Sequence, residues 1–394
     1  MNAELIGPDD PRWRQVLEAV AHDVYHLPGY GPLYERDPKV QELALHVRGE
    51  GAELLLPLLV RPLPELAGAP SLSGWSDAAS PYGYPGPVVR GAFSPEELDG
   101  LRDCFGDLLR ERRILACFVR GAPLLADGDA LLERLGAVVR HGDTAVIELD
   151  RPDEEILEGY SNLNHRIIGR ALKRGYTVRV DDWSQLPGFV ALYQENMRRV
   201  GAAPFYFFDA DYFARLKALL GDRAHLVSVL SPTGELAGGQ LITACHRLVN
   251  AHLNATSGAH LDVSPCRLMN DATWRWARAN GARIVNFGGG YGGRSDSLLA
   301  FKMSFATGTR PFRTARLICD QRRYEVACAA AGAGGGDLAD FFPAYRGNVF
   351  TRSEAESAAA PASVREAERQ SEEKTRGGPA RAVLVPAPPR GPHA

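Results

Sequence analysis

The stretch NFGGGYGGRSDSLLAFKMSF, residues 286–305, is the most specific part of this sequence. It has the pattern of a buried strand that ends in three consecutive glycines and is followed by a short helix. Glycines at a strand end let the backbone approach a ligand closely and expose its N–H donors. Arg294 and Lys302 lie about two helical turns apart, so both could face one cleft. A tight turn followed by two solvated cations is the alternative interpretation of the same residues.

The segments around this stretch repeat one order of elements: hairpin strands, a helix, a strand and a second helix. In the first half, residues 43–48 and 53–60 are predicted to form a hairpin. In the second half, three antiparallel strands are predicted at residues 226–230, 236–244 and 248–256. No residue-by-residue repeat accompanies this order, so the duplication is inferred from the elements alone.

Length and composition agree with an α/β protein of two mixed-sheet units. At 394 residues the chain exceeds one ordinary domain, and a hydrophobic content of 45% suffices for a sizeable core. We therefore predict a first unit at residues 1–155 and a second, catalytic unit at residues 156–345. Residues 353–394 consist mainly of Ala, Pro, Glu, Arg and Ser, so we predict a disordered tail there.

Charge and cysteine usage exclude several classes of protein. A net charge of −3 gives no global attraction for polyanions, so no DNA partner is predicted and a tRNA would need a local basic patch. The six cysteines show neither a CxxC pair nor a Cys/His cluster at metal-ligand spacing, so we predict no metal site and no disulfide scaffold. The sequence starts without the basic and apolar regions of a signal peptide, and no apolar stretch approaches a membrane-spanning length. A cytoplasmic protein without a membrane span is expected.

The stretch at residues 286–305 resembles the signature of the Fem-type (FemAB-like) aminoacyltransferases, which have two fused acetyltransferase-like (GNAT) units. In that family a glycine-rich strand end leads into a helix carrying Phe-Lys-x-x-Phe, here Phe301, Lys302 and Phe305. Three further segments are similar to the family's substrate loop, basic helix and Tyr-x-x-x-Met-x-Arg segment: SPYGYPGP at residues 80–87, NHRIIGRALKRGYTVRV at residues 164–180 and YQENMRRVGAAPFYFF at residues 193–208.

The resemblance implies transfer of an acyl or aminoacyl group from an activated carrier onto an amine, without a tightly bound cofactor. Fem proteins take the group from aminoacyl-tRNA. A coenzyme A-dependent acetyltransferase usually presents Arg/Gln-x-x-Gly-x-Gly/Ala before a helix N-terminus that binds the pyrophosphate. Here that position has GAHLDVSPCRLM at residues 258–269, and the carboxylate of Asp262 would repel a pyrophosphate. Aminoacyl-tRNA is therefore favoured as the donor, with acyl-CoA as the alternative.

The acceptor amine stays open: a peptide, a cell-wall precursor or a small molecule. Family members that act on the cell-wall precursor often place an acidic residue after the Pro-x-Gly-Pro of the substrate loop, whereas this chain has Val88, Val89 and Arg90. A catalytically inactive binding or scaffold protein is the alternative of a different class. The retained glycines and Lys302 favour an enzyme over it. The oligomeric state also stays open.

Two residues are candidates for the chemistry. The resemblance implies that the ammonium of Lys302 helps hold the donor's carbonyl or terminal phosphate region while the amine attacks. His252 alternates with Asn254 on a predicted strand, so both side chains project from one face, and the imidazole could act as a general base. A histidine satisfied in the core or at its rim is the alternative for His252.

Further residues are candidates for substrate binding. Arg166, Arg170 and Lys173 form one stripe on a predicted helix and suit either phosphate recognition or a solvated face. Tyr82 and Tyr84 of the substrate loop either stack on the acceptor or plug the loop against the core. The other candidates come from the segments that carry the resemblance and from the strand of His252: Tyr193, Arg199, Asn254, Gly288, Gly289, Gly290, Tyr291, Arg294 and Phe301.

Overall fold

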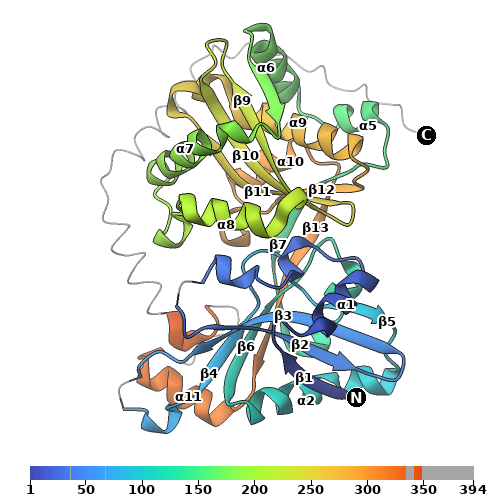
Figure 1. Cartoon of the computed structure of the whole chain (residues 1–394), viewed down its shortest axis with the longest axis vertical. Helices are drawn as coiled ribbons and strands as arrows, with labels where there is room; N and C mark the ends of the chain where they lie inside the picture. Colours follow the sequence, from blue (N-terminus) through green and yellow to red (C-terminus); the bar gives the residue numbers. More distant parts are fainter. Residues whose placement is uncertain (36, 67, 334–340, 348–394) are drawn as a thin grey trace, which may run out of the picture.

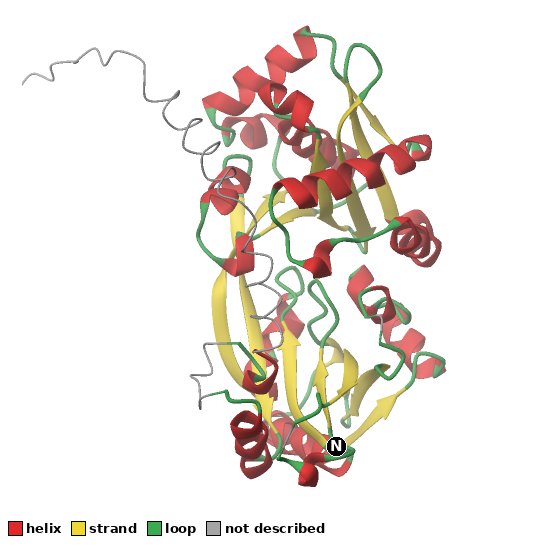
Figure 2. Ribbon diagram, turned by 90° about the vertical axis from the view of Figure 1, so that its left-hand side faces the viewer, coloured by secondary structure: helices red, strands yellow, loops and turns green. Residues whose placement is uncertain are grey.

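The computed structural model describes residues 1–35, 37–66, 68–333 and 341–347. The tail predicted at residues 353–394 lies outside these described residues. Within the described part, thirteen strands form one mixed sheet that runs through both halves of the molecule (Figure 1). Helices lie on the outside of this sheet in both halves, as Figure 2 shows.

The first half of the chain builds one end of the sheet. Its strands are β1 (Asn2–Ile6), β2 (Gln41–Arg48), β3 (Ala52–Pro62), β4 (Ser76–Ala79), β5 (Val88–Gly91) and β6 (Ile114–Arg120). Its helices are α1 (Pro11–Ala19), α2 (Pro95–Glu111), α3 (Ala126–Ala130) and α4 (Leu132–Leu135). The predicted hairpin is present as β2 and β3, with Leu43 opposite Leu58. β4 and β6 run parallel, and α2 makes the crossover between them.

The second half of the chain builds the other end of the sheet. Its strands are β8 (Thr177–Val180), β9 (Ala224–Leu230), β10 (Leu236–Cys245), β11 (Leu248–Thr256) and β12 (Ile284–Gly288). Its helices are α5 (Asp153–Glu158), α6 (Asn162–Lys173), α7 (Leu186–Arg199), α8 (Ala210–Leu220), α9 (Pro265–Ala279), α10 (Ser297–Met303) and α11 (Gln321–Ala330). The three predicted antiparallel strands are β9, β10 and β11. β11 and β12 run parallel and are joined by α9.

Two long strands are exchanged between the halves. β7 (Ala137–Glu148) ends the first half but pairs with β12, and β13 (Gly308–Ile318) ends the second half but pairs with β6. β7 and β13 also pair with each other, and this antiparallel ladder joins the halves in the middle of the molecule (Figure 1). From either end, the sheet therefore has the same order: four antiparallel strands, one parallel strand and one strand donated by the other half.

The same strand order in both halves agrees with the predicted repeat, whereas the exchange of β7 and β13 was not predicted. Because β13 completes the sheet of the first half, the sheet itself does not divide near residue 155. The two proposed units are thus interlocked, and their boundary as folding units stays a prediction.

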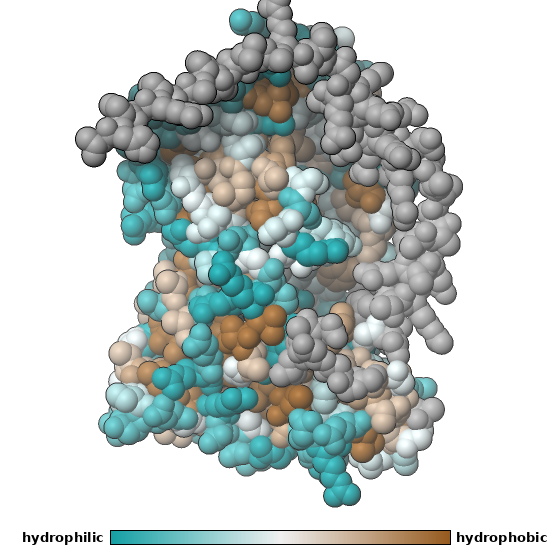
Figure 3. Space-filling model, turned by 180° about the vertical axis from the view of Figure 1, so that it is seen from behind, coloured by the Kyte–Doolittle hydropathy of each residue, from teal (hydrophilic) through white to brown (hydrophobic). Residues whose placement is uncertain are grey.

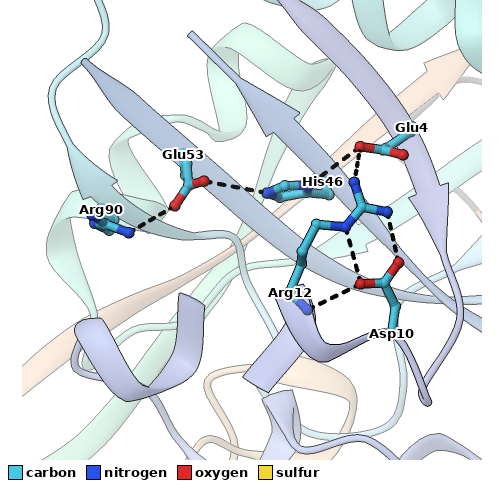
Figure 4. A network of polar contacts seen from close by, with 6 residues as sticks. All are labelled: Glu4, Asp10, Arg12, His46, Glu53 and Arg90. Atoms are coloured by element: carbon cyan, nitrogen blue, oxygen red, sulfur yellow. Dashed lines mark hydrogen bonds and ion pairs between the residues drawn. The ribbon is translucent and has the colours of Figure 1, made fainter. Parts of the chain in front are cut away.

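A network of charged side chains fastens the short strand β1 to the edge of the sheet (Figure 4). Arg12, in the first turn of α1, pairs with Glu4 of β1 and, at 2.6 Å, with Asp10. The buried His46 of β2 lies 3.7 Å from Glu4 and 3.8 Å from Glu53 of β3. Partly exposed ion pairs contribute only about 0–1 kcal/mol each. The network therefore fixes the position of an edge strand more than it stabilises the fold.

Each half has its own hydrophobic core. Trp274 of α9 is fully buried in the second half, and Trp13 of α1 is fully buried in the first. Seen from behind, the uncovered surface mixes hydrophilic and hydrophobic residues (Figure 3). Among the helices of the described residues, none combines the length and the apolar character needed to cross a bilayer.

Candidate active site

The candidate site lies where the parallel strands β11 and β12 stop pairing. Their ladder has only three residue pairs, and the last of them is Asn250 opposite Asn286. Beyond this point β12 pairs with β7 alone, while the register of β11 against β10 skips His252. Such a bulge bends its strand and redirects a side chain. Asn250 and Asn286 therefore mark the point where β11 and β12 separate, which we call the fork.

A buried chain of hydrogen bonds runs from the first half into this fork. The Asn286 amide donates to Asn250 Oδ1 at 3.1 Å, and the Asn250 amide donates to Asp23 Oδ2 at 2.8 Å. At the other end, the backbone N–H of Gly288 donates to Asn286 Oδ1 at 2.8 Å. Burial raises the pKa of Asp23 to about 6, although hydrogen bonds from Asn250 and the Val24 N–H oppose this shift. The carboxylate thus orients both amides toward the glycine-rich loop.

Lys302 points back at the same loop from α10. Asp296 caps this helix by accepting a hydrogen bond from the Leu299 N–H at 2.9 Å, and Lys302 Nζ donates to the carbonyl oxygen of Gly289 at 2.5 Å. Burial lowers the pKa of Lys302 to about 8, while the negative charge of Asp296 acts in the opposite direction. At pH 7 the side chain is therefore an ammonium with little solvent around it.

Tyr84 brings the substrate loop of the first half to this point. A Cβ atom on Gly288 would lie 3.3 Å from the Tyr84 hydroxyl oxygen and 3.5 Å from Lys302 Nζ, and Gly288 has a φ of 75°. Burial raises the pKa of Tyr84 to about 12, against hydrogen bonds with the Asn286 side chain and the Gly289 backbone. We call Tyr84, Gly288, Gly289 and Lys302 the catalytic corner. Both chain halves contribute to it.

His252 lies in a cluster of tyrosines beside this corner. Its Nε2 atom is 2.6 Å from the hydroxyl oxygen of Tyr34, which is also 2.6 Å from that of Tyr212. Burial lowers the pKa of His252 to about 4, so its imidazole is neutral at pH 7. The Tyr25 ring lies 6.1 Å from the His252 ring and 5.8 Å from the Tyr84 ring. The Tyr25 ring is thus a neighbour of both His252 and Tyr84 of the corner.

Tyr82 belongs to this tyrosine cluster and not to the corner. Its ring centroid is 4.9 Å from that of Tyr34, 5.7 Å from that of Phe205 and 6.3 Å from that of His252. Phe205 is 43% exposed, so the cluster reaches the surface. The two tyrosines of the substrate loop therefore have different surroundings: Tyr84 meets polar groups in addition to the rings of Tyr25 and Phe312, whereas Tyr82 lies among rings.

Polar atoms without partners lie near the end of β11 that carries Asn254 and Thr256. Over the described residues, Asn254 Oδ1, Arg199 Nε and two nitrogens of Arg267 are buried without a hydrogen bond. Arg199 Nη2 donates to the Thr256 carbonyl oxygen at 3.4 Å, and the Arg267 guanidinium lies 5.0 Å from the centre of the Phe301 ring. Buried donors and acceptors without partners are rare, and they suit a ligand that would satisfy them.

Arg267 is absent from the sequence-based candidates. It occupies the third position of α9, within the segment at residues 258–269 in which the coenzyme A motif is missing. Ser264 precedes this helix with a left-handed φ of 52°, and no side chain caps the helix. The signal that could have found Arg267 is a cation in the first turn of a helix, where the dipole disfavours it.

The carboxylate of Asp262 is paired. It accepts a hydrogen bond from Arg174, which follows α6, at 2.8 Å, and this contact lowers the pKa of Asp262. Repulsion of a phosphate by Asp262 is therefore weaker than the sequence implied. The exposed cations of α6 have no ion pair within the part of the chain that the structure describes: Arg166, Arg170 and Lys173.

The remaining candidates are not among the four residues of the corner. Tyr193 is buried against Phe208, with its hydroxyl donating to the Tyr206 carbonyl oxygen at 2.9 Å. Arg294 is exposed and lies over the ring of Tyr291. Gly290 is required by the turn itself, since a Cβ atom there would overlap the Arg294 carbonyl oxygen and the Asp296 carboxylate.

Comparisons with known proteins identify one domain of this chain and its fold. Residues 164–297 match the family model of the acetyltransferase (GNAT) domain. The crystal structure of FemX is similar in fold, with a TM-score of 0.61 and 18% identity over 83% of this chain and 99% of that one. The C-terminal domain of a putative lysylphosphatidylglycerol synthetase from Agrobacterium fabrum has a TM-score of 0.49 and 14% identity, over 82% of this chain and 94% of its own. No curated protein matched in sequence. The predicted tandem GNAT fold is confirmed by the likeness to FemX.

Proposed function

We propose that this chain, which combines a GNAT domain with a fold like that of FemX, is an acyltransferase that moves an aminoacyl group from aminoacyl-tRNA onto an amine. The observation that carries the proposal is the catalytic corner. There a partly desolvated ammonium and a tyrosine hydroxyl from opposite chain halves meet at the glycine-rich end of β12. Nothing in this corner resembles a nucleophile–base pair, and direct attack by an amine on an activated ester needs none.

The reaction needs charge compensation at one oxygen. The acceptor nitrogen attacks the ester carbonyl carbon, a C–N bond forms, and the carbonyl oxygen gains negative charge. The ester C–O bond then breaks, the leaving hydroxyl takes up a proton, and the new amide nitrogen releases one. In our proposal the Lys302 ammonium exchanges its contact with the Gly289 carbonyl oxygen for the developing oxyanion. An ammonium in a partly desolvated site stabilises such a charge more strongly than it would in water.

The roles of the two halves differ in this proposal. The first half supplies Tyr84 to the corner and Asp23 to the hydrogen-bond chain behind it. His252 stays a candidate proton acceptor, because its imidazole is neutral. Its contacts with Tyr34 and Tyr25 support a role in positioning the tyrosine cluster around the acceptor.

Two observations bear on the donor. The unpaired exposed cations of α6 support recognition of tRNA phosphates, which are many and widely spaced. The segment at residues 258–263 forms a 3₁₀ turn with one glycine, Gly258, and lacks the second glycine of a pyrophosphate cradle. Acyl-CoA is the second candidate, favoured by the uncapped N-terminus of α9 and by the buried nitrogens of Arg267.

The acceptor proposal is an amine of a peptide, a cell-wall precursor or a small molecule. The ring cluster that contains Tyr34, Tyr82 and Phe205 supports an acceptor with an apolar or planar portion next to its amine. Val88 and Val89 lie in β5, paired with β3, so they are part of the sheet and not of a binding loop.

The deciding experiment supplies the protein with tRNA charged with labelled amino acids and with a mixture of peptides and small amines. A parallel sample is treated with RNase, and another receives labelled acyl-CoA in place of tRNA. Transfer that disappears after RNase treatment and in Lys302→Met protein supports the proposal. Transfer from acyl-CoA that survives RNase makes the chain a coenzyme A-dependent enzyme. No transfer from either donor by folded protein would favour the binding or scaffold class.

A further inference from the structure

A cluster of potential metal ligands lies outside the candidate active site. The ligand atoms of His22, Cys245 and His246 all lie within 4.8 Å of one another. His22 follows α1 in the first half, whereas Cys245 ends β10 and His246 begins the turn to β11. The cluster therefore bridges the two halves of the chain. The sequence predicted no metal site because two of these residues are adjacent and the third is distant.

Each of the three side chains is placed as a ligand would need to be. His22 Nδ1 donates to the Val20 carbonyl oxygen at 3.1 Å. A metal-binding histidine almost always donates its second ring N–H in this way. Cys245 is buried and is not part of a disulfide. The His246 ring lies 4.1 Å from that of His22, on a turn where His246 and Arg247 both have positive φ.

We propose that His22, Cys245 and His246 bind one Zn²⁺ ion, with a water molecule as the fourth ligand. Two imidazoles and one thiolate suit zinc and exclude calcium and magnesium, which prefer oxygen. Zinc–ligand distances of about 2.0–2.3 Å in a tetrahedron bring ligand atoms to roughly 3.3–3.7 Å from one another. The cluster needs to contract by about 1 Å, and the exposed turn that carries His246 is the part free to move.

Two charged groups lie near the cluster. Arg223 makes a side-chain hydrogen bond to Cys245. Because a thiol must lose its proton to bind zinc, binding would release a proton to solvent. The Arg223 guanidinium repels a divalent ion, whereas the nearby carboxylate of Asp23 attracts it.

A metal here would act on the contact between the halves. His22 directly precedes Asp23, whose carboxylate begins the hydrogen-bond chain to the catalytic corner. Binding would fix His22 against the β10–β11 turn and so hold Asp23 in place. This inference does not depend on the proposed acyl transfer, because the cluster shares no residue with the corner.

The test titrates metal-free protein with Zn²⁺ and, separately, with Co²⁺, whose thiolate complex absorbs in the near ultraviolet. We expect one equivalent to bind, a thiolate-to-cobalt band, and a melting temperature that rises with zinc concentration. Losing an outer-shell partner of a zinc ligand costs about 10–100-fold in affinity, so losing a ligand in Cys245→Ser should cost at least about 100-fold. The matched control is Cys104→Ser, in α2, which should bind as the unaltered protein does.

His246→Asn is the second variant, because His246 is exposed and its replacement leaves the core intact. It should keep the melting temperature of the metal-free protein and lose the zinc-dependent rise. The proposal is overturned if the unaltered protein shows neither band nor rise. It is equally overturned if folded Cys245→Ser and His246→Asn bind zinc as tightly as the Cys104→Ser control.

Discussion

The two halves of this molecule share one strand order but end their parallel ladders differently. In the first half the last residue pair of β4 and β6 is Ala79 opposite Phe118. Hydrogen bonds of the residues that follow close the gap between these two strands. The Ser80 N–H donates to the Phe118 carbonyl oxygen at 2.8 Å, and the Arg120 N–H donates to Ser80 Oγ at 2.8 Å. In the second half the last pair is Asn250 opposite Asn286, and their side chains lead to the catalytic corner.

The N-termini of α2 and α9, the helices that join the parallel strands in each half, also differ. α2 begins at a complete capping box, in which Ser94 and Glu97 satisfy each other's backbone N–H groups. α9 has no side-chain cap and carries Arg267 in its first turn. The same strand order therefore occurs once with the fork closed, in the first half, and once with it open, in the second half. In the proposed reaction the second half carries out the chemistry, and the first half contributes Tyr84 and Asp23.

The sharpest test of this difference is Lys302→Met. An ammonium aimed at a developing oxyanion contributes about 2.7–4 kcal/mol, so kcat/KM should fall about 10²–10³-fold while the protein folds normally. Lys302→Arg should restore activity only in part, because a planar guanidinium replaces a point charge poorly. Steady-state kinetics with circular dichroism as a fold control would check this. Near-normal activity of the folded Lys302→Met variant would contradict the proposal that the second half carries out the chemistry.

The pH dependence of kcat/KM should follow the charge of Lys302. Burial lowers the pKa of Lys302 to about 8, so the charged form is present below this pH and is lost as the pH rises through it. On the alkaline side kcat/KM should therefore fall about tenfold per pH unit. Lys302→Arg should move this limb to higher pH, since guanidinium stays charged. If kcat/KM of Lys302→Arg falls at the same alkaline pH as that of the unaltered protein, the fall is due to another group.

Asn286→Ala tests the open fork directly. Removing this amide leaves Asn250 Oδ1 and the Gly288 N–H without their buried partner, which should lower the free energy of unfolding by about 1–3 kcal/mol. Because the glycine loop loses its support, kcat should also fall by about tenfold, equivalent to about 1.4 kcal/mol. Denaturant unfolding and kinetics measure both effects. Asn280→Ala, at the exposed end of α9, is the control that should change neither.

The basic stripe of α6 should matter for binding and not for turnover. Arg166→Ala or Arg170→Ala should raise KM for the donor a few-fold at constant kcat, because each removes one phosphate contact present throughout the reaction. The dependence of affinity on salt should become shallower by about one phosphate contact. Arg215→Ala, on α8, is the matched surface control. If salt does not affect KM in the unaltered protein, the stripe is a solvated face.

The smallest effect is expected in the closed half. Ser94→Ala breaks the capping box of α2 and should lower the free energy of unfolding by about 1 kcal/mol. Activity at a temperature well below the melting point should be unchanged. A loss of kcat in this variant would mean that the first half does more than support the second.

The structure confirms some expectations from the sequence and replaces others. The mixed α/β fold, the hairpin of the first half and the strand β12 leading through glycines into α10 agree with the local patterns. Lys302 contacts the glycine loop through the Gly289 carbonyl oxygen. Arg294 lies over the ring of Tyr291, and Asp262 is paired with Arg174. The roles of all the candidate site residues stay predictions.

The sequence by itself determined the order of elements and the position of the glycine-rich corner, because strand and helix periodicities and turn residues are local properties. Only the tertiary structure decided the exchange of β7 and β13 and the entry of Tyr84 into the second half. It alone also decided the approach of His22 to Cys245. These contacts join segments far apart in the chain, and packing of the whole sheet selects them. No spacing within either segment carries that information.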